Sequence, residues 1–220
     1  MKKVSYIQAL INEGEHQQQD FKFGITDSRK IARSLVAFAN TDGGRLLIGV
    51  KDNGIIAGVR SEEEYYMIES AAQLYSKPEI RFESKVWKDE GKTVLEVWAP
   101  PSPLRPHFVK EDAGVWQAYV RSRDENIQAD EVLISVWQKM KQKKGTLIRY
   151  TKIEEELFRL FQTRDQITLS DFRKNARITS KQAVETLANL IVLRLILQVV
   201  ASPESFFRIN QEFTASAAGK

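Results

Sequence analysis

Between residues 28 and 44 the chain carries a helical pattern of apolar positions that ends at two glycines. Ile31, Leu35 and Phe38 fall at i, i+4 and i+7, and alanines and a valine beside them widen the apolar stripe. This spacing predicts a largely buried helix. The run Asn40-Thr41-Asp42-Gly43-Gly44 then predicts a helix end and a tight reversal into a strand, because glycine adopts positive φ at low cost.

Short apolar strands and turn signals fill much of the remaining sequence up to residue 143. Leu46 to Val50 is an apolar strand, and Asp52-Asn53-Gly54 after it favours a hairpin turn, with Ile55 to Val59 as the returning strand. Hairpins, rather than repeated strand–helix–strand units, predict an α+β domain with a mixed or antiparallel sheet and flanking helices. The other elements predicted in domain 1–143 are helices capped by Ser5 and Ser61, a strand over 20–23, strand pairs within 81–98 and 107–120, and a closing helix from Ala129 to Met140.

The pattern changes after Gly145 to three helices followed by a hairpin. Apolar residues with helical spacing occur over 153–161, 169–176 and 183–191, and Thr179 is placed to cap the third helix. Two apolar strands then flank Ala201-Ser202-Pro203-Glu204. This order in a short segment predicts a winged-helix domain over 147–212, followed by a small-residue flexible tail over 213–220.

Composition narrows the classes of function. The chain has no cysteine and only two histidines, which excludes disulfides and thiolate metal sites and argues against a histidine zinc site. No apolar stretch reaches the length of a membrane helix, so we expect a cytoplasmic protein without a membrane partner. The formal charge is +4. Residues 146–220 hold 11 Lys and Arg against 8 Asp and Glu, so most of the excess lies in the predicted winged helix.

Several motifs of the first domain resemble the Schlafen-type AlbA DNA-binding domain family. The central match is Phe38 to Gly44 followed by Ile48-Gly49-Val50-Lys51-Asp52. Flanking elements that look like the family pattern are Gly14-Glu15, Asp20-Phe21-Lys22, Val97 to Pro101, Pro106-His107 and Tyr119-Val120-Arg121-Ser122, so the resemblance covers roughly residues 6–135. The chain departs from the pattern at Asp20, where the family usually has Glu, and at Arg123, where it usually has Gly.

The resemblance implies a possible catalytic role for three acidic residues. In Schlafen nucleases, acids at the positions that match Glu15, Asp20 and Asp52 are implicated in metal-dependent RNA cleavage, with a lysine at the position of Lys22. Clustered carboxylates could hold Mg²⁺ or Mn²⁺, and Lys22 could neutralise developing charge. The alternative is structural: Glu15 is solvated, Asp20 pairs with Lys22 or a helix N-terminus, and Asp52 opens a turn. No cofactor is required by the sequence outside this nuclease hypothesis.

The glycine run after the first buried helix has two interpretations. Gly43 and Gly44 could let backbone N–H groups approach a phosphate, or they could serve only the reversal of the chain, which we favour. Asn40 could lock the turn in either case.

Cationic and polar side chains offer candidate nucleic-acid contacts in both domains. In a winged helix the third helix would enter the DNA major groove, with flanking cations on phosphates. On the strand near residue 120, Arg121 and Arg123 share a face with Tyr119 and could clamp a nucleic-acid backbone, or pack in the sheet. The candidates are Arg173, Lys174, Arg177, Ser180, Lys181, Gln182 and Arg208 in the winged helix, and Arg121 and Arg123 in the first domain.

The sequence as a whole favours a DNA-binding protein that regulates transcription, with RNA as a second possible ligand and a homodimer as the expected assembly. One alternative is a metal-dependent endoribonuclease of the Schlafen type, the single enzyme activity that the motifs suggest. The other is a module for protein interaction or dimerisation.

Overall fold

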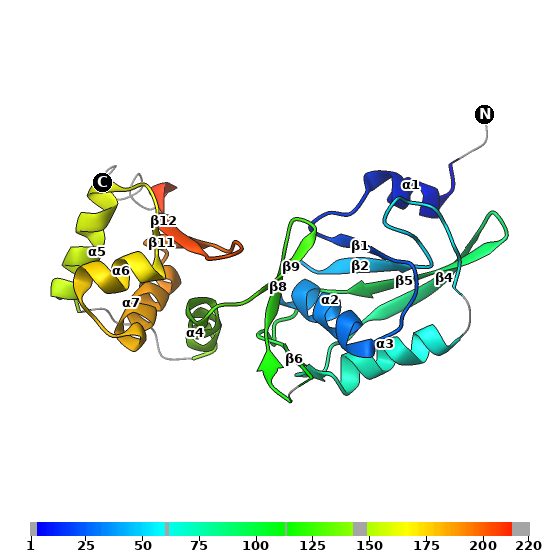
Figure 1. Cartoon of the computed structure of the whole chain (residues 1–220), viewed down its shortest axis with the longest axis horizontal. Helices are drawn as coiled ribbons and strands as arrows, with labels where there is room; N and C mark the ends of the chain where they lie inside the picture. The colour runs from blue at the N-terminus through cyan, green and yellow to red at the C-terminus, as the bar shows by residue number, and fades with distance from the viewer. Residues whose placement is uncertain (1–3, 60–61, 113, 143–148, 213–220) are drawn as a thin grey trace. The chain divides into compact units, whose positions relative to one another are not determined.

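The computed structural model describes residues 4–59, 62–112, 114–142 and 149–212 (Figure 1). The chain divides into two compact units, Met1–Gln128 and Ala129–Lys220. The predicted cap at Ser61 and the predicted tail over 213–220 lie outside the described residues.

A four-stranded mixed sheet forms the centre of the first unit. Its strand order is β1-β2-β5-β4, with β1 parallel to β2 and the other two pairs antiparallel. The prediction of an α+β fold with a mixed sheet is therefore confirmed. The four strands are β1 (Gln19–Lys22), β2 (Gly44–Ile48), β4 (Glu83–Asp89) and β5 (Lys92–Ala99).

Helices cover both faces of this sheet because the strands are apolar on both sides. Leu46 and Ile48 pack with α2 (Ser28–Asn40) and α3 (Glu63–Gln73), whereas Leu47 packs with α1 (Tyr6–Glu13). In Figure 1 the sheet lies between α1 and the α2–α3 pair. Ser5, as predicted, accepts the backbone hydrogen bond that caps α1, and Asp27 does the same for α2.

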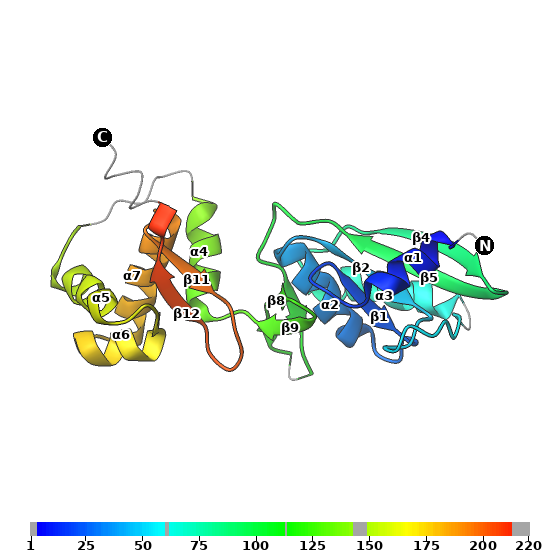
Figure 2. The same ribbon diagram turned by 90° about the horizontal axis from the view of Figure 1, so that it is seen from above.

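Shorter strands complete the first unit. The β8–β9 hairpin lies against α2 (Figure 2). The segment 55–59 does not return as a full strand: Val50 and Ile56 form a single bridge, and β2 pairs with β1 and β5 instead. The sequence also failed to indicate β9. The remaining strands are β3 (Ser76–Lys77), β6 (Phe108–Lys110), β7 (Trp116–Gln117), β8 (Tyr119–Ser122) and β9 (Glu125–Gln128).

Helix α4 (Glu131–Met140) belongs to the second unit, not to the first as its sequence position suggested. Its buried residues Val132 and Val136 join the apolar core of the second unit, and α4 packs along α7 (Ser180–Val192). The apolar face of a helix is therefore a poor guide to which neighbouring core it enters, since either core could bury it.

The other elements of the second unit follow the predicted order, with one added strand. Three helices and a hairpin are present, and β10 (Ile167–Thr168) joins the hairpin in a sheet of order β10-β12-β11. Thr179 caps α7 and shares a capping box with Gln182. Every helix of the described ranges is too short or too polar to cross a bilayer. The remaining elements are α5 (Lys152–Thr163), α6 (Leu169–Ala176), β11 (Ile196–Val199) and β12 (Phe206–Ile209).

Candidate functional site

A buried charge cluster lies where β1 meets β8 in the first unit. The Asp20 carboxylate is 2.8 Å from Nζ of Lys22 and 3.7 Å from the guanidinium of Arg121. Counted over the whole residue, Asp20 is 4% exposed and Arg121 3%. Because a buried charge is costly unless it is paired, this cluster holds its members in fixed positions.

Glu15 joins this cluster and shares a hydrogen bond with Asp20. Burial, followed by that hydrogen bond, raises the pKa of Glu15, although its oxygen also accepts from the Phe21 N–H at 2.8 Å. Burial alone would raise the pKa of Asp20 as well, but the hydrogen bond from Glu15 and the charges of Lys22 and Arg121 outweigh it, so the pKa of Asp20 is lowered. The two neighbouring carboxyl groups therefore have pKa values shifted in opposite directions.

Arg121 is a structural residue, which corrects its assignment as a nucleic-acid contact. Its guanidinium donates to the Gln19 carbonyl at 3.2 Å and to the Asn126 side chain at 3.1 Å, and lies 5.3 Å from the Phe38 ring centre. These contacts tie β8 to β1 and α2 and leave the side chain inaccessible to a polyanion.

Asp52 does not complete a three-carboxylate metal site with Glu15 and Asp20. It lies exposed in the turn after β2, and no group of three or more His, Cys, Asp or Glu with metal-site geometry occurs among the described residues. Glu15 and Asp20 thus lie together without Asp52, and a metal-binding or catalytic role for them stays a prediction. The expectation that Asp20 pairs with Lys22 also fits the observed contact.

Asn40, Gly43 and Gly44 form a structural turn. The Asn40 side chain donates to the carbonyls of His107 and Tyr119 at 3.0 and 2.9 Å and accepts from the His107 N–H at 2.8 Å. The Gly43 N–H donates to the Phe38 carbonyl, and a side chain at Gly44 would collide with the Phe38 ring. These contacts fit the interpretation that the glycines serve the reversal of the chain. The Gly43 N–H already donates to a backbone carbonyl, so nothing supports its binding a phosphate.

Tyr119 and Arg123 do not form a shared clamp with Arg121. The Tyr119 hydroxyl donates to Glu111, which also pairs with Arg33, and burial with this hydrogen bond raises the pKa of Tyr119 to about 12. Arg123 is exposed in the turn after β8, where its φ is 57° and its N–H donates to Gln17. The left-handed backbone explains why glycine suits this position.

In the second unit, four exposed cations gather where α6 ends and α7 begins. Arg173 and Lys174 lie in the last turn of α6, Arg177 is its left-handed C-cap, and Lys181 is in the first turn of α7. Their exposure leaves them accessible to a ligand. Ser180 is half-buried beside them, and the Gln182 side chain accepts from Thr179 in the capping box.

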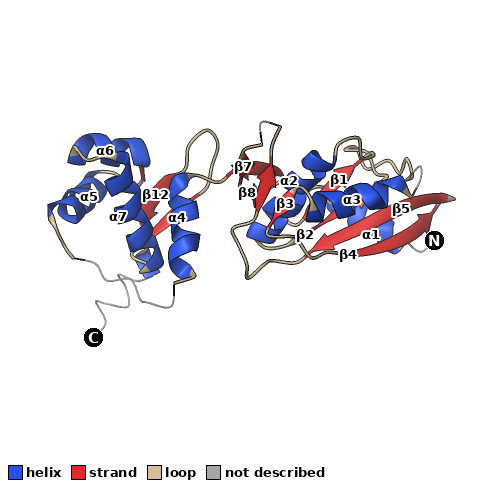
Figure 3. Cartoon of the chain, turned by 90° about the horizontal axis from the view of Figure 1, so that it is seen from below, coloured by secondary structure: helices blue, strands red, loops and turns tan. Residues whose placement is uncertain are grey.

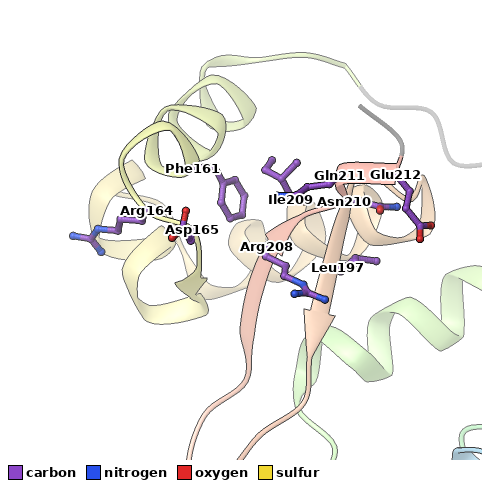
Figure 4. A pocket seen from close by; sticks show the side chains of 9 residues that line it. All are labelled: Phe161, Arg164, Asp165, Leu197, Arg208, Ile209, Asn210, Gln211 and Glu212. Carbon is purple, nitrogen blue, oxygen red and sulfur yellow. The ribbon is translucent and has the colours of Figure 1, made fainter. Parts of the chain in front are cut away.

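Arg208 does not extend this cationic corner. It pairs across the sheet with Leu197, while its neighbour Phe207 points into the core beside α7. Successive side chains alternate between the faces of a strand, so Arg208 lies on the outer face of the sheet. There it lines a hollow of about 550 Å³ with Phe161 and Arg164 (Figure 4).

Sequence reasoning missed a group of aromatic and charged residues on the α1 side of the sheet, next to the area that α1 covers. Arg45 pairs with Trp98 across β2 and β5 and lies 5.7 Å from its ring centre, and Lys85 lies 4.1 Å above the Trp87 ring. Glu96 accepts hydrogen bonds from Tyr6 and Trp87. The alternation of apolar and polar residues along β5 could have indicated these residues, because it places Glu96 and Trp98 on one face of the strand.

Comparison with known proteins places the first unit in a family. Two solved structures resemble part of the chain. One is a crystal structure of a protein from Corynebacterium diphtheriae, with a TM-score of 0.42 and 17% identity over 61% of this chain and 30% of that one. The other is the solution structure of the N-terminal domain of a Nitrosomonas europaea protein described as related to the ATP-dependent DNA helicase RecG, with a TM-score of 0.39 and 21% identity over 59% of this chain and 96% of that one. The family model described as Schlafen, AlbA_2 matches residues 15–130, more than half of the sequence. The chain therefore belongs to the Schlafen AlbA_2 family.

Proposed function

We propose that the protein binds nucleic acid, with double-stranded DNA as the preferred ligand, through the corner between α6 and α7. The observation that carries this proposal is the group of exposed cations Arg173, Lys174, Arg177 and Lys181 on two consecutive helices. Phosphate contacts supply most of the affinity of DNA-binding proteins, and membership of the AlbA_2 family also favours nucleic acid in general.

A winged-helix identity for the second unit supports DNA over RNA. The order α5-β10-α6-α7-β11-β12, with β12 between β10 and β11, is the arrangement of a helix-turn-helix followed by a β-hairpin. In this geometry α7 is the recognition helix. Ser180 and Lys181 at its N-terminus face base edges, and Arg173, Lys174 and Arg177 contact phosphates.

Regulation of transcription follows as the biological role that we propose for this interface. A helix-turn-helix protein that reads two half-sites does so as a two-fold dimer. We accordingly propose a homodimer as the DNA-binding form.

The test is fluorescence anisotropy with labelled duplex DNA and with single-stranded RNA over a series of salt concentrations. The expected logarithmic slope of affinity against salt is about −0.9 per neutralised phosphate. The double variant Arg177→Ala/Lys181→Ala is expected to weaken binding and to reduce the magnitude of that slope by about 1 for each phosphate that is no longer neutralised.

The matched control is Lys152→Ala/Arg159→Ala, which removes the same charge from exposed positions of α5. If both double variants weaken binding equally, net charge alone explains the effect and the proposed corner is wrong. Tighter binding of RNA than of duplex DNA would contradict the preference for DNA.

Cleavage of nucleic acid is scored in the same samples, with and without Mn²⁺. Glu15, Asp20 and Lys22 lie together, but Asp52 does not complete their site. We therefore expect intact RNA and DNA. Metal-dependent cleavage that Asp20→Asn abolishes would assign nuclease activity to the first unit.

A further inference from the structure

Strand β4 is an open edge of the central sheet in the first unit. It is seven residues long, pairs with β5 on one side, and is the last strand in the order β1-β2-β5-β4. Figure 3 shows it along the outer margin of the sheet. Most of its residues are exposed, including Val86 at 61%. An exposed edge strand is a template for pairing with another strand.

The hairpin geometry identifies the backbone groups that face this open edge. Glu90 and Gly91 form the two-residue turn, both with positive φ, and Asp89 faces Lys92 next to it. In such a hairpin the flanking pair is hydrogen-bonded and the pairs alternate from there. The N–H and C=O groups that point toward β5 therefore belong to Asp89, Trp87, Lys85 and Glu83. Those that point outward belong to Ser84, Val86 and Lys88.

An apolar hollow lies beside this edge on the α3 side of the sheet. It measures about 560 Å³, and Val86, Leu95, Tyr65 and Tyr66 contribute to its lining. Tyr66 is 61% exposed and Tyr65 37%. Glu62 is the one charged residue among the described residues that line it. Apolar surface next to unpaired backbone is the combination that a docking strand covers.

We propose that β4 pairs with β4 of a second copy of this chain, antiparallel, with Val86 at the two-fold axis. A closed two-fold contact requires that each strand meet an identical one in reverse. With Val86 on the axis, Ser84 faces Lys88 of the partner subunit, so all three outward-facing residues pair and about six backbone hydrogen bonds form. The two Val86 side chains meet at the edge of the apolar hollow.

The charges of β4 favour this register over its neighbours. A two-fold axis at Lys85 would oppose two lysines, and an axis at Trp87 would set Val86 against a lysine and leave Ser84 beyond the paired strand. In the Val86 register, Lys85 faces the partner's Trp87, the same kind of cation–π contact that these two residues make within one chain. Lys88 also approaches the face that carries the partner's Glu62. This register has one like-charge contact, in which Glu83 faces the partner's Asp89 at each end of the paired strands.

The edge lysines make this pairing selective. Lys85 and Lys88 discourage pairing with an arbitrary strand, since they place charge on both faces of the edge. In the proposed register they meet Trp87 and Ser84 instead of another cation. This inference supplies a surface for the proposed homodimer and does not depend on DNA binding.

Sedimentation of the full chain without nucleic acid tests the proposal. We expect wild-type protein to be dimeric and Val86→Pro to be monomeric, since proline removes an outward N–H that β5 does not use. Circular dichroism and thermal unfolding check that the variant is folded. Val86→Thr, which keeps the N–H and the strand propensity, is the control and should remain dimeric. A monomeric wild type would overturn the proposal, and so would a dimer that Val86→Pro leaves intact.

Crosslinking tests the register. The chain has no cysteine, so Val86→Cys introduces a single thiol, and at a hydrogen-bonded pair the two Cα atoms would be about 5.5 Å apart, within disulfide range. We expect oxidation to give a covalent dimer. Val115→Cys, at a valine that is 58% exposed, is the matched control and should stay uncrosslinked. Equal crosslinking of the two variants would contradict the register. Loss of DNA binding in a protein that remains dimeric would contradict only the proposed function.

Discussion

The guanidinium of Arg121 lies 3.7 Å from the Asp20 carboxylate, and the two side chains are 2% and 6% exposed. This pair joins β8 to β1 across the first unit. Asp20 also pairs with Lys22, and Arg121 also donates to the Gln19 carbonyl, so these contacts fix β1, the strand that carries Asp20. The motif arginine that sequence reasoning assigned to nucleic acid therefore organises the acidic residues.

Replacement of Arg121 should cost stability and not intrinsic ligand affinity. Arg121→Met leaves Asp20 buried with Lys22 as its remaining cation, and we expect a loss of roughly 3 kcal/mol in the free energy of unfolding. Urea denaturation measures this loss. The double variant Asp20→Asn/Arg121→Met should recover part of it, because it leaves no uncompensated charge; a strictly additive double variant would show that the two side chains are not coupled.

The opposite pKa shifts of Glu15 and Asp20 should appear in the dependence of stability on pH. The pKa of Glu15 is raised above its ordinary 4.5, so its contribution is complete below that pH and is lost as the pH rises through the folded value. The pKa of Asp20 is lowered below 3.8, so its contribution is present above that pH and is lost as the pH falls through its folded value. Together they predict a stability maximum on the acidic side of neutrality.

Thermal unfolding of Glu15→Gln over a pH series checks this expectation. Glutamine cannot ionise, so the variant should lack the part of the wild-type decline above pH 4.5 that Glu15 causes. Glu125→Gln, at an exposed position of β9, is the control and should follow the wild-type curve. Identical pH profiles for wild type and Glu15→Gln would show that the pKa of Glu15 is not raised in the folded protein.

Gly44→Ala should destabilise the first unit. A Cβ at this position would lie 2.2 Å from the Phe38 ring, which is fully buried and cannot move aside without opening the core. We expect a cost of about 1–3 kcal/mol, as for other overpacked sites, measured by chemical denaturation. Gly24→Ala is the comparison, because a Cβ there meets no atom within 4 Å. Equal stability of the two variants would mean that Gly44 is free to accept a side chain.

Local pattern was enough to predict the elements with strong periodicity or specific turn residues. The helix with Ile31, Leu35 and Phe38 and the cap at Thr179 were predicted from the sequence and are present. The segment 55–59 was predicted as the hairpin partner of β2, but β5 takes that place from much later in the chain. Local turn composition cannot indicate a long-range strand that competes for the same edge.

Sequence-based prediction of the candidate site failed for the same physical reason, because long-range contacts decide where a side chain lies. The spacing of Arg121 and Arg123 suggested one shared face, but Asp20 lies close enough to bury the first, and the backbone turns before the second. Asp52 is the last residue of the matched motif but lies in an exposed turn. The closeness of the cations of α6 and α7 could be expected, because the two helices are consecutive and joined by a short connection. The position of Arg208 on the outer face of the sheet could be found only once the pairing of β11 with β12 was known.

Replacement of Arg123 by glycine should be tolerated or stabilising. A non-glycine residue at φ 57° carries a steric cost of about 1–2 kcal/mol, which glycine avoids, while the greater freedom of glycine in the unfolded chain offsets part of the gain. We expect Arg123→Gly to raise the free energy of unfolding by up to about 1 kcal/mol. Arg123→Ala keeps the Cβ and should show no gain. A loss of stability in Arg123→Gly alone would indicate that the backbone here is not strained.

Arg208→Ala should leave DNA affinity unchanged, in contrast to Lys181→Ala. Both changes remove one exposed cation from the second unit, so their effect on net charge is the same. Lys181 lies in the first turn of α7, whereas Arg208 lies on the outer face of the sheet, opposite the side on which α7 packs. A ligand seated on α7, the proposed recognition helix, therefore reaches Lys181 and not Arg208. Anisotropy titrations at two salt concentrations should show a smaller salt slope for Lys181→Ala and the wild-type slope for Arg208→Ala. If Arg208→Ala weakens binding as strongly as Lys181→Ala, the DNA crosses the outer face of the sheet and the hollow beside Phe161 becomes part of the interface.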